Sequence, residues 1–294
     1  MYKNVLLCLF LLLSVGCASL VDKAGEGDLK SVQRMVGEGA NPNETDDCTA
    51  PLVYAAEKGH VEVVEYLLAH GADPNVRLPE CIRSIPLLGT VRTSGHTALY
   101  YVRDPAMVKI LMDAGANPAL AGATEYKDGS AGADFPLTVA IRSDNLELME
   151  LYLKSGATPN YYSESGENFF IWQASLNKKK KPELAAQMIA LLRRYGARDL
   201  NTSATALKAT ESGPHLAYRN IYTGQVTTMD SGIAQRLYNY PNSLAPITFD
   251  SHQKRYLHMV HFEWVDNGQN LHEWYLQRVL YLKATRKASS SGTP

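Results

Sequence analysis

The chain lacks the cysteine patterns that mark a zinc site or a disulfide scaffold. Its 294 residues include only four cysteines, which lie far apart and form no C-x-x-C pair. Structural zinc sites and small disulfide-rich folds need closer or more numerous cysteines. Both classes are therefore excluded.

The chain also lacks an excess of charge of either sign. Its 29 basic and 30 acidic residues leave a formal net charge of −1. Proteins that bind nucleic acid or anionic membranes over most of their surface carry a strong basic excess. The balance of charges argues against such a dominant basic surface. Hydrophobic residues make up 45% of the chain, which suffices for a buried core.

Familiar catalytic motifs are missing. The sequence contains no G-x-S-x-G, no phosphate loop and no dinucleotide fingerprint. Cys48 and Cys81 have no histidine near them in sequence that would activate a thiolate. We therefore predict no enzyme and no cofactor.

Four residues near the C-terminus could be imagined as metal ligands, namely His258, His261, Glu263 and His272. On a strand, His258 and His261 point to opposite faces, and the spacing matches no known ligand motif. We interpret the group as cross-strand pairing beside a solvent edge and predict no metal site.

The only long apolar run covers residues 5–15. It is too short to span a bilayer, which takes about 20 residues. Lys3 precedes the run, and the small residues Gly16 and Ala18 follow it. This is the layout of a secretory signal peptide.

The end of that segment, SVGC, resembles the lipobox of bacterial lipoproteins. Gly16 and Cys17 match it, whereas Ser14 stands where a leucine is usual. The resemblance implies that residues 1–16 are removed and that Cys17 carries acyl chains, several of which anchor a protein stably. Because Ala18 is not an aspartate, the implied location is the outer membrane, facing the periplasm. The alternative is ordinary cleavage near Ala18, with Cys17 discarded or free.

Residues 50–75, APLVYAAEKGHVEVVEYLLAHGADPN, resemble the ankyrin repeat. That family has a Thr-Pro-Leu-His turn, an alanine-rich helix, a Gly-His turn, a second apolar helix and a Gly-Ala-Asp ending. Ala50 and Val53 replace the Thr and His of the family's turn. The matching residues are Pro51-Leu52, Ala55-Ala56, Gly59-His60, Val63-Val64, Leu67-Leu68 and Gly71-Ala72-Asp73.

The ending recurs four more times, at residues 38–43, 114–119, 155–160 and 195–200. Each glycine can end a helix in the left-handed conformation without a Cβ penalty. One helix pair cannot bury its apolar face alone, so neighbours must stack. We expect about five ankyrin units over residues 17–200, with a shortened first helix in the third and a lengthened turn in the fifth. The predicted fold is mainly α, an ankyrin-repeat solenoid followed by a small β-rich α+β C-terminal domain.

Two connectors between units are long, at residues 76–96 and 120–134. In ankyrin arrays such connectors are hairpin fingers on the binding side, and long insertions often map to the binding face. We assign function to the first connector because of its apolar residues Ile82, Ile85, Leu87 and Leu88. We interpret the glycine-rich second connector as a tolerated surface insertion.

Cys48 and Cys81 lie in successive finger connectors, which stack side by side in an ankyrin array. An exported protein meets an oxidising compartment, which permits a disulfide. The sequence leaves open whether the two are bonded or free, because it does not give the Cα separation.

After a linker at residues 201–212, we expect a separate domain over residues 213–283 and a disordered tail over 284–294. Eleven of the 26 aromatic residues fall within residues 215–281, enough to build a small core. Alternation up to Trp264 and the Asp266-Asn267-Gly268 turn predict one hairpin, and Thr223-Gly224 predicts another. Residues 230–241 predict a short helix stopped by Pro241.

The basic run Lys178–Lys181 precedes Pro182. We interpret it as a solvated turn between two helices. The alternative is contact with phospholipid headgroups or with an acidic partner.

The ankyrin resemblance implies a protein-binding module rather than an enzyme, with docking on the concave face. Tyr and Arg are residue types that often carry interface energy. The residues expected to bind the partner are Arg77, Glu80, Arg83 and Arg92 on the first long connector, and Tyr54, Lys58, Tyr101 and Arg142 on the first helices.

One specific form of this protein-binding hypothesis is an immunity protein that neutralises a toxic periplasmic effector, by analogy with other exported repeat lipoproteins. The rival hypothesis is an envelope enzyme or ligand-binding protein with its site in residues 215–281. A third is an envelope tether without a discrete partner.

Overall fold

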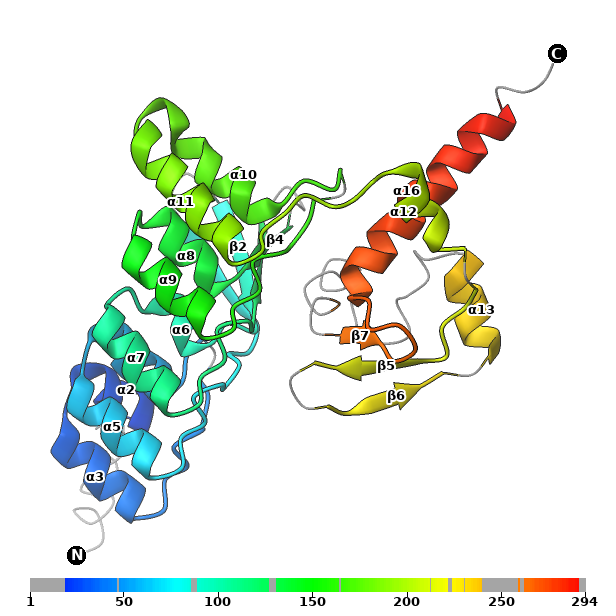
Figure 1. Cartoon of the computed structure of the whole chain (residues 1–294). Coiled ribbons are helices and arrows are strands. Elements are labelled where there is room, and N and C mark those ends of the chain that lie inside the picture. Colours follow the sequence, from blue (N-terminus) through cyan, green and yellow to red (C-terminus); the bar gives the residue numbers. More distant parts are fainter. Residues whose placement is uncertain are drawn as a thin grey trace, which may run out of the picture. The chain divides into compact units, whose positions relative to one another are not determined.

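The computed structural model describes residues 19–290, except 47, 86–88, 127–130, 164, 212, 222–223, 230, 240–258 and 260–261 (Figure 1). Cys17 and the expected signal segment at residues 1–16 lie outside the described residues. The chain divides into two compact units, Met1–Ile82 with Thr97–Ala116, and Arg83–His96 with Asn117–Pro294.

The first unit contains three helix pairs. The helices are α2 (Leu20–Glu26), α3 (Leu29–Gly37), α4 (Pro51–Lys58), α5 (Val61–Ala69), α6 (Ala98–Tyr101) and α7 (Pro105–Asp113). Ser19 and Asp22 form a capping box that starts α2, and Gly59 ends α4 at φ 80°. Helix α6 has only four residues, so the predicted shortening of this first helix is confirmed.

The second unit contains two further pairs, α8 (Pro136–Arg142) with α9 (Leu146–Lys154), and α10 (Phe169–Ser175) with α11 (Pro182–Arg194). A 3-10 turn, η1 (Leu176–Lys179), extends the link between α10 and α11. The predicted lengthened turn is therefore confirmed. Pro136 and Pro182 stand at the starts of their helices, where a missing N–H costs nothing.

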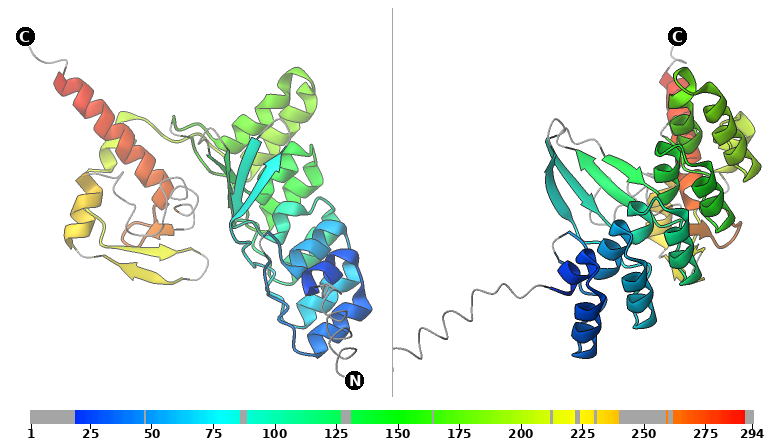
Figure 2. Two further views of the ribbon diagram at one scale, coloured as in Figure 1. Left: turned by 180° about the vertical axis from the view of Figure 1, so that it is seen from behind. Right: turned by 90° about the vertical axis from the view of Figure 1, so that its left-hand side faces the viewer.

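The two long connectors form one sheet, which we call the finger sheet. Its strands are β1 (Cys81–Ile85), β2 (Gly89–Ser94), β3 (Gly122–Tyr126) and β4 (Ala131–Asp134), in the order β1-β2-β3-β4. Strand β3 pairs antiparallel with both β2 and β4, and Figure 2 shows the strands side by side. The hairpin form of both connectors is confirmed, and the glycine-rich second connector is part of the sheet.

Among its described residues, the C-terminal part has a second antiparallel sheet, ordered β6-β5-β7, and the helices α12, α13 and α16. Hydrogen bonds between β5 and β6 confirm the hairpin predicted at Thr223-Gly224. The helix predicted before Pro241 is confirmed as α13, whereas Pro241 itself lies outside the described residues. The elements are α12 (Ala204–Ala209), β5 (Ala217–Asn220), β6 (Val226–Thr228), α13 (Ser231–Asn239), β7 (Phe262–Trp264) and α16 (Leu271–Ser290).

One strand prediction is wrong, because the turn at Gly268 leads into helix α16 and not into a second strand. The Asn270 side chain accepts hydrogen bonds from the backbone N–H groups of His272 and Glu273, as a helix cap does. Leu271, Trp274 and Tyr275 are all buried at the three- and four-residue spacing of a helix. The helix continues to Ser290, through most of the segment predicted to be disordered.

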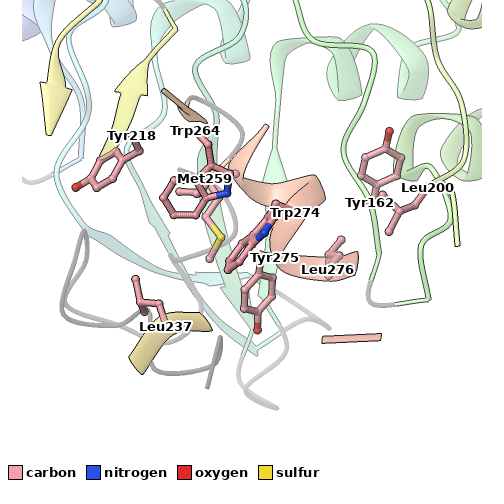
Figure 3. Close-up of a cluster of buried hydrophobic side chains, with 10 residues drawn as sticks. Tyr162, Leu200, Tyr218, Leu237, Met259, Trp264, Trp274, Tyr275 and Leu276 are labelled. Atoms are coloured by element: carbon pink, nitrogen blue, oxygen red, sulfur yellow. The ribbon is translucent and has the colours of Figure 1, made fainter. Parts of the chain in front are cut away.

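An aromatic core holds this part of the second unit together (Figure 3). Trp264 and Trp274 are each 1% exposed and meet edge to face at 5.1 Å between ring centroids. Tyr162 and Leu200, from the chain around the last helix pair, belong to the same cluster. Within the described residues, no helix combines the length and the apolar character needed to cross a membrane.

Candidate functional site

The finger sheet carries two of the arginines predicted to bind a partner. Arg92 of β2 lies directly opposite Glu125 of β3, with 3.8 Å between Arg92 Nη1 and Glu125 Oε2. Arg83 of β1 is exposed, and beside it the Ile82 side chain is 58% exposed. Ile85, Leu87 and Leu88, the other apolar residues of this finger, have no described side chains. The exposed part of β1 therefore combines an apolar and a basic side chain.

A buried polar node fixes the finger sheet to helix α8. Asp134, at the end of β4, is 4% exposed and accepts a hydrogen bond from the Thr124 hydroxyl. His96 Nε2 lies 3.2 Å from Asp134 Oδ2, and Arg142 Nη1 lies 3.7 Å from Asp134 Oδ1. The side chains of Thr124, His96 and Arg142 thus converge on the Asp134 carboxylate. Their interactions compensate the cost of burying this charged group.

Gly122 completes this node by leaving room for the His96 ring. A Cβ at Gly122 would lie 2.1 Å from His96 Cδ2, closer than any real contact. Arg142 was predicted as a partner-binding residue, and its side chain is half exposed even though it pairs with Asp134. The Arg142 side chain can therefore contact a partner while its ion pair with Asp134 holds the finger sheet against α8.

Two predicted residues share helix α4 of the first unit. Lys58 Nζ lies 5.2 Å from the centroid of the Tyr54 ring, within the range of a cation–π interaction. The Tyr54 ring also packs on Gly25, where a Cβ would lie 2.1 Å from Tyr54 Cδ1. Tyr54 is therefore half-buried and supports the α2–α4 contact, whereas Lys58 is exposed.

A disulfide joins Cys48 to Cys81 at the base of the first finger. The Cα atoms are 4.9 Å apart, within the normal range for a disulfide. Arg77 and Glu80 are exposed just before Cys81, while Leu78 between them is buried. The bridge therefore fixes the segment that carries two of the predicted binding residues.

Tyr101, the remaining predicted residue, ends helix α6 and is partly buried. Its ring meets that of Tyr100 edge to face at 5.2 Å. In the first unit, Tyr54, Lys58 and Tyr101 lie on first helices, and α4 packs against α6. Arg83, Arg92 and Arg142 lie in the second unit.

The histidines weighed as metal ligands have other surroundings. His272 is buried, stacks on Tyr161 at 4.9 Å, and has its Nε2 atom 3.3 Å from the carbonyl oxygen of Tyr162. Burial lowers the pKa of His272 to about 4, and burial raises the pKa of the Tyr162 hydroxyl to about 12. His272 is therefore a neutral packing residue near pH 7.

Glu263 pairs with Arg219 across the C-terminal sheet, with 3.1 Å between Arg219 Nε and Glu263 Oε1. His258 and His261 lie outside the described residues. Among the residues that the structure describes, no three His, Cys, Asp or Glu side chains are grouped to hold a metal ion.

Sequence reasoning missed two features, one buried and one on the surface. The node around Asp134 depends on the pairing of strands far apart in the chain, so no local signal in the sequence indicated it. The other is on the last helix pair, where Trp172 is 48% and Leu176 is 58% exposed. On a helical wheel continued from α10 into η1, Trp172 and Leu176 fall on the side away from the buried Phe170 and Ala174.

Comparisons with known proteins agree with the repeat architecture. Residues 20–122 match the family model for ankyrin repeats (3 copies), so this part of the chain contains ankyrin repeats. Three similar proteins are the mouse 2-5A-dependent ribonuclease (39% identical over 62 residues), an ankyrin repeat protein of fowlpox virus (42% over 53) and zygote-specific protein 3 of Chlamydomonas reinhardtii (38% over 58).

These matches cover only a small part of this chain and of each similar protein. They cover 20%, 17% and 20% of this chain, and 8%, 7% and 16% of the three proteins in the same order. The ribonuclease name therefore belongs to a protein of which this chain matches a small part. What the matches carry over is the ankyrin repeat, which generally mediates protein–protein interaction.

Proposed function

We propose that this chain binds another protein of the bacterial cell envelope through its finger sheet. The observation that carries the proposal is the finger sheet itself. Two long connectors, which repeats do not need for stacking, form one sheet that exposes Ile82, Arg83 and Arg92. The partner surface that suits these side chains has carboxylates around an apolar centre.

We propose further that the chain is exported and held at a membrane by lipid on Cys17. The lipobox resemblance of SVGC supports the lipid, and the Cys48–Cys81 disulfide supports an oxidising compartment such as the periplasm. Ala18 favours the outer membrane. The anchor predicts that labelled palmitate enters the wild-type protein and not a Cys17→Ser variant.

Under this proposal the chain is not an enzyme, and its partner is an exported protein. The more specific role of an immunity protein against a periplasmic effector rests on analogy alone. A toxin gene beside the gene for this chain would support it.

Affinity capture from envelope extracts tests the binding proposal. The bait is a chain from Ser19 to Pro294, which retains every element that the structure describes. The matched baits carry Arg83→Glu with Arg92→Glu, or Lys30→Glu with Lys208→Glu as a control of equal charge change on exposed helices. A protein that the first pair loses and the second pair retains is the expected partner.

A further inference from the structure

The link between α10 and α11 carries an apolar and basic patch, which we call the tip patch and define as Trp172, Leu176 and Lys178–Lys180. Trp172 and Leu176 are four residues apart, so they lie on one side of the α10–η1 segment. They are 48% and 58% exposed. Neither is needed for the core, because Phe170 and Ala174 are the side chains that α10 buries completely.

Three exposed lysines follow these apolar side chains. Lys178, Lys179 and Lys180 are all exposed, and no ion pair of theirs occurs among the described residues. Lys181, by contrast, is paired with Asp144. Glu183 in the first turn of α11 is the one nearby acidic residue in sequence. The patch therefore keeps a local positive charge although the whole chain is nearly neutral.

We infer that the tip patch binds the surface of an anionic phospholipid bilayer. Tryptophan and leucine beside lysines are the combination that lies at the boundary of headgroups and acyl chains. The lysine stems reach along the apolar surface while their ammonium groups meet lipid phosphates. The patch is a turn of a few side chains, which suits a lipid surface better than a protein interface of about 800 Å² per partner.

This inference does not depend on Cys17 or on the finger sheet. A basic patch is a common additional signal beside a lipid anchor. Contact through the tip patch would add a second point of attachment in the part of the chain around α10 and α11 (Figure 1).

Tryptophan fluorescence offers a direct test, because Trp172 is the exposed member of the three tryptophans. Trp264 and Trp274 are each 1% exposed, so a change of emission on binding reports on Trp172. The protein is the chain from Ser19 to Pro294, which carries no lipid. The probes are vesicles of phosphatidylcholine with phosphatidylglycerol, and vesicles of phosphatidylcholine alone as the neutral control.

We expect a blue shift with the anionic vesicles, its loss in high salt, and no shift with neutral vesicles. A Trp172→Phe variant should still bind, with the shift abolished. Replacing Lys178, Lys179 and Lys180 by Gln should lower the partition coefficient by more than tenfold, since each lysine near such a surface contributes about fivefold. The control variant Lys30→Gln, Lys109→Gln and Lys208→Gln has the same net charge and should stay within about twofold of wild type.

Three results would overturn the inference. The first is no partitioning onto anionic vesicles while the helical spectrum of the protein is intact. The second is an equal loss in both triple-lysine variants, which would assign binding to net charge. The third is binding of an acidic polypeptide such as polyglutamate at the patch without binding to vesicles, which would make the partner a protein.

Discussion

The side-chain amide of Asn43 donates a 2.8 Å hydrogen bond to the backbone carbonyl of Gly71, the glycine at the end of the next repeat's second helix. Its Oδ1 atom accepts a 2.6 Å hydrogen bond from the backbone N–H of Asp73. The link recurs in two other repeats, with Asn75 donating to Gly115 and Asn160 donating to Gly196, both at 3.0 Å, whereas Ala119 stands at this place in the third repeat. One asparagine therefore ties the end of its own repeat to the end of the following one.

Replacing Asn43 by Ala should lower the free energy of unfolding by about 1 kcal/mol, the net contribution of such hydrogen bonds. Asn43→Asp keeps the acceptor for Asp73 and loses the donor to Gly71, so it should destabilise at least as much. Urea unfolding followed by circular dichroism measures both. Full stability of the Asp variant would show that the donated bond contributes nothing.

The repeats were predictable because their signals are local. Glycines 71, 115 and 196 end second helices at φ near 90°, as the recurring endings indicated. The residue that receives each asparagine bond was not predictable, because it lies about 30 to 40 positions further along the chain. Only the stacking of complete units brings the two together.

Reduction of the Cys48–Cys81 disulfide should destabilise the first unit. The two cysteines are 33 residues apart, and the loop-closure model gives about 4 kcal/mol for such a loop. Thermal unfolding with and without dithiothreitol measures the effect. A Cys48→Ser, Cys81→Ser double variant serves as the control, and its unfolding should not respond to the reductant. An equal response in both proteins would contradict a role for the bridge.

The polar node predicts a cost for removing Asp134. Asp134→Ala leaves the buried Thr124 hydroxyl and His96 ring without their shared acceptor, which should cost about 2–4 kcal/mol. Asp134→Asn keeps an oxygen at this place and should cost less. Hydrogen exchange of the β3 and β4 amides should rise in the Ala variant before other regions change. Unchanged exchange there would separate the node from the order of the finger sheet.

Acidification should weaken the packing of α16 through His272. Burial holds the pKa of His272 at about 4, while an unfolded histidine titrates near its ordinary value of 6.5. The unfolded chain therefore binds the proton first, and stability falls as the pH drops from 6.5 towards 4. Between pH 7 and pH 5 the loss is about 2 kcal/mol.

Urea unfolding at both pH values checks this prediction. His272→Phe keeps a ring against Tyr161 and cannot titrate, so its stability should vary less with pH. His70→Phe replaces an exposed histidine directly after α5 and should leave the wild-type pH dependence in place. The same pH dependence in His272→Phe as in wild type would contradict the assignment.

The C-terminal part shows where sequence reasoning failed and why. Residues 271–283 include Trp274, Tyr275, Val279 and Tyr281, which favour strands, and they follow a turn suited to a hairpin. The helix forms because Asn270 caps it and because Leu271, Trp274 and Tyr275 all reach one aromatic core. The strand prediction gave the turn and the aromatic residues more weight than the leucines and charged residues of the same segment, which favour a helix.

The candidate site was predicted in part, for a related reason. The finger arginines Arg83 and Arg92 were predictable from an insertion within a repeat pattern. Glu125, which pairs with Arg92, and Asp134, which pairs with Arg142, were not predictable, since they come from the connector interpreted as a tolerated loop. Their roles depend on the strand register Arg92↔Glu125 and on burial at the end of β4.

Binding of a partner at the finger sheet is the central claim, and comparative affinity capture tests it most directly. We expect the wild-type bait and the Lys30→Glu, Lys208→Glu bait to retain the same envelope protein. The Arg83→Glu, Arg92→Glu bait should bind that protein at least about 30-fold more weakly, as expected when an interface arginine worth about 2 kcal/mol is lost. Equal retention of that protein by all three baits, or no protein retained above bare resin, would contradict the account.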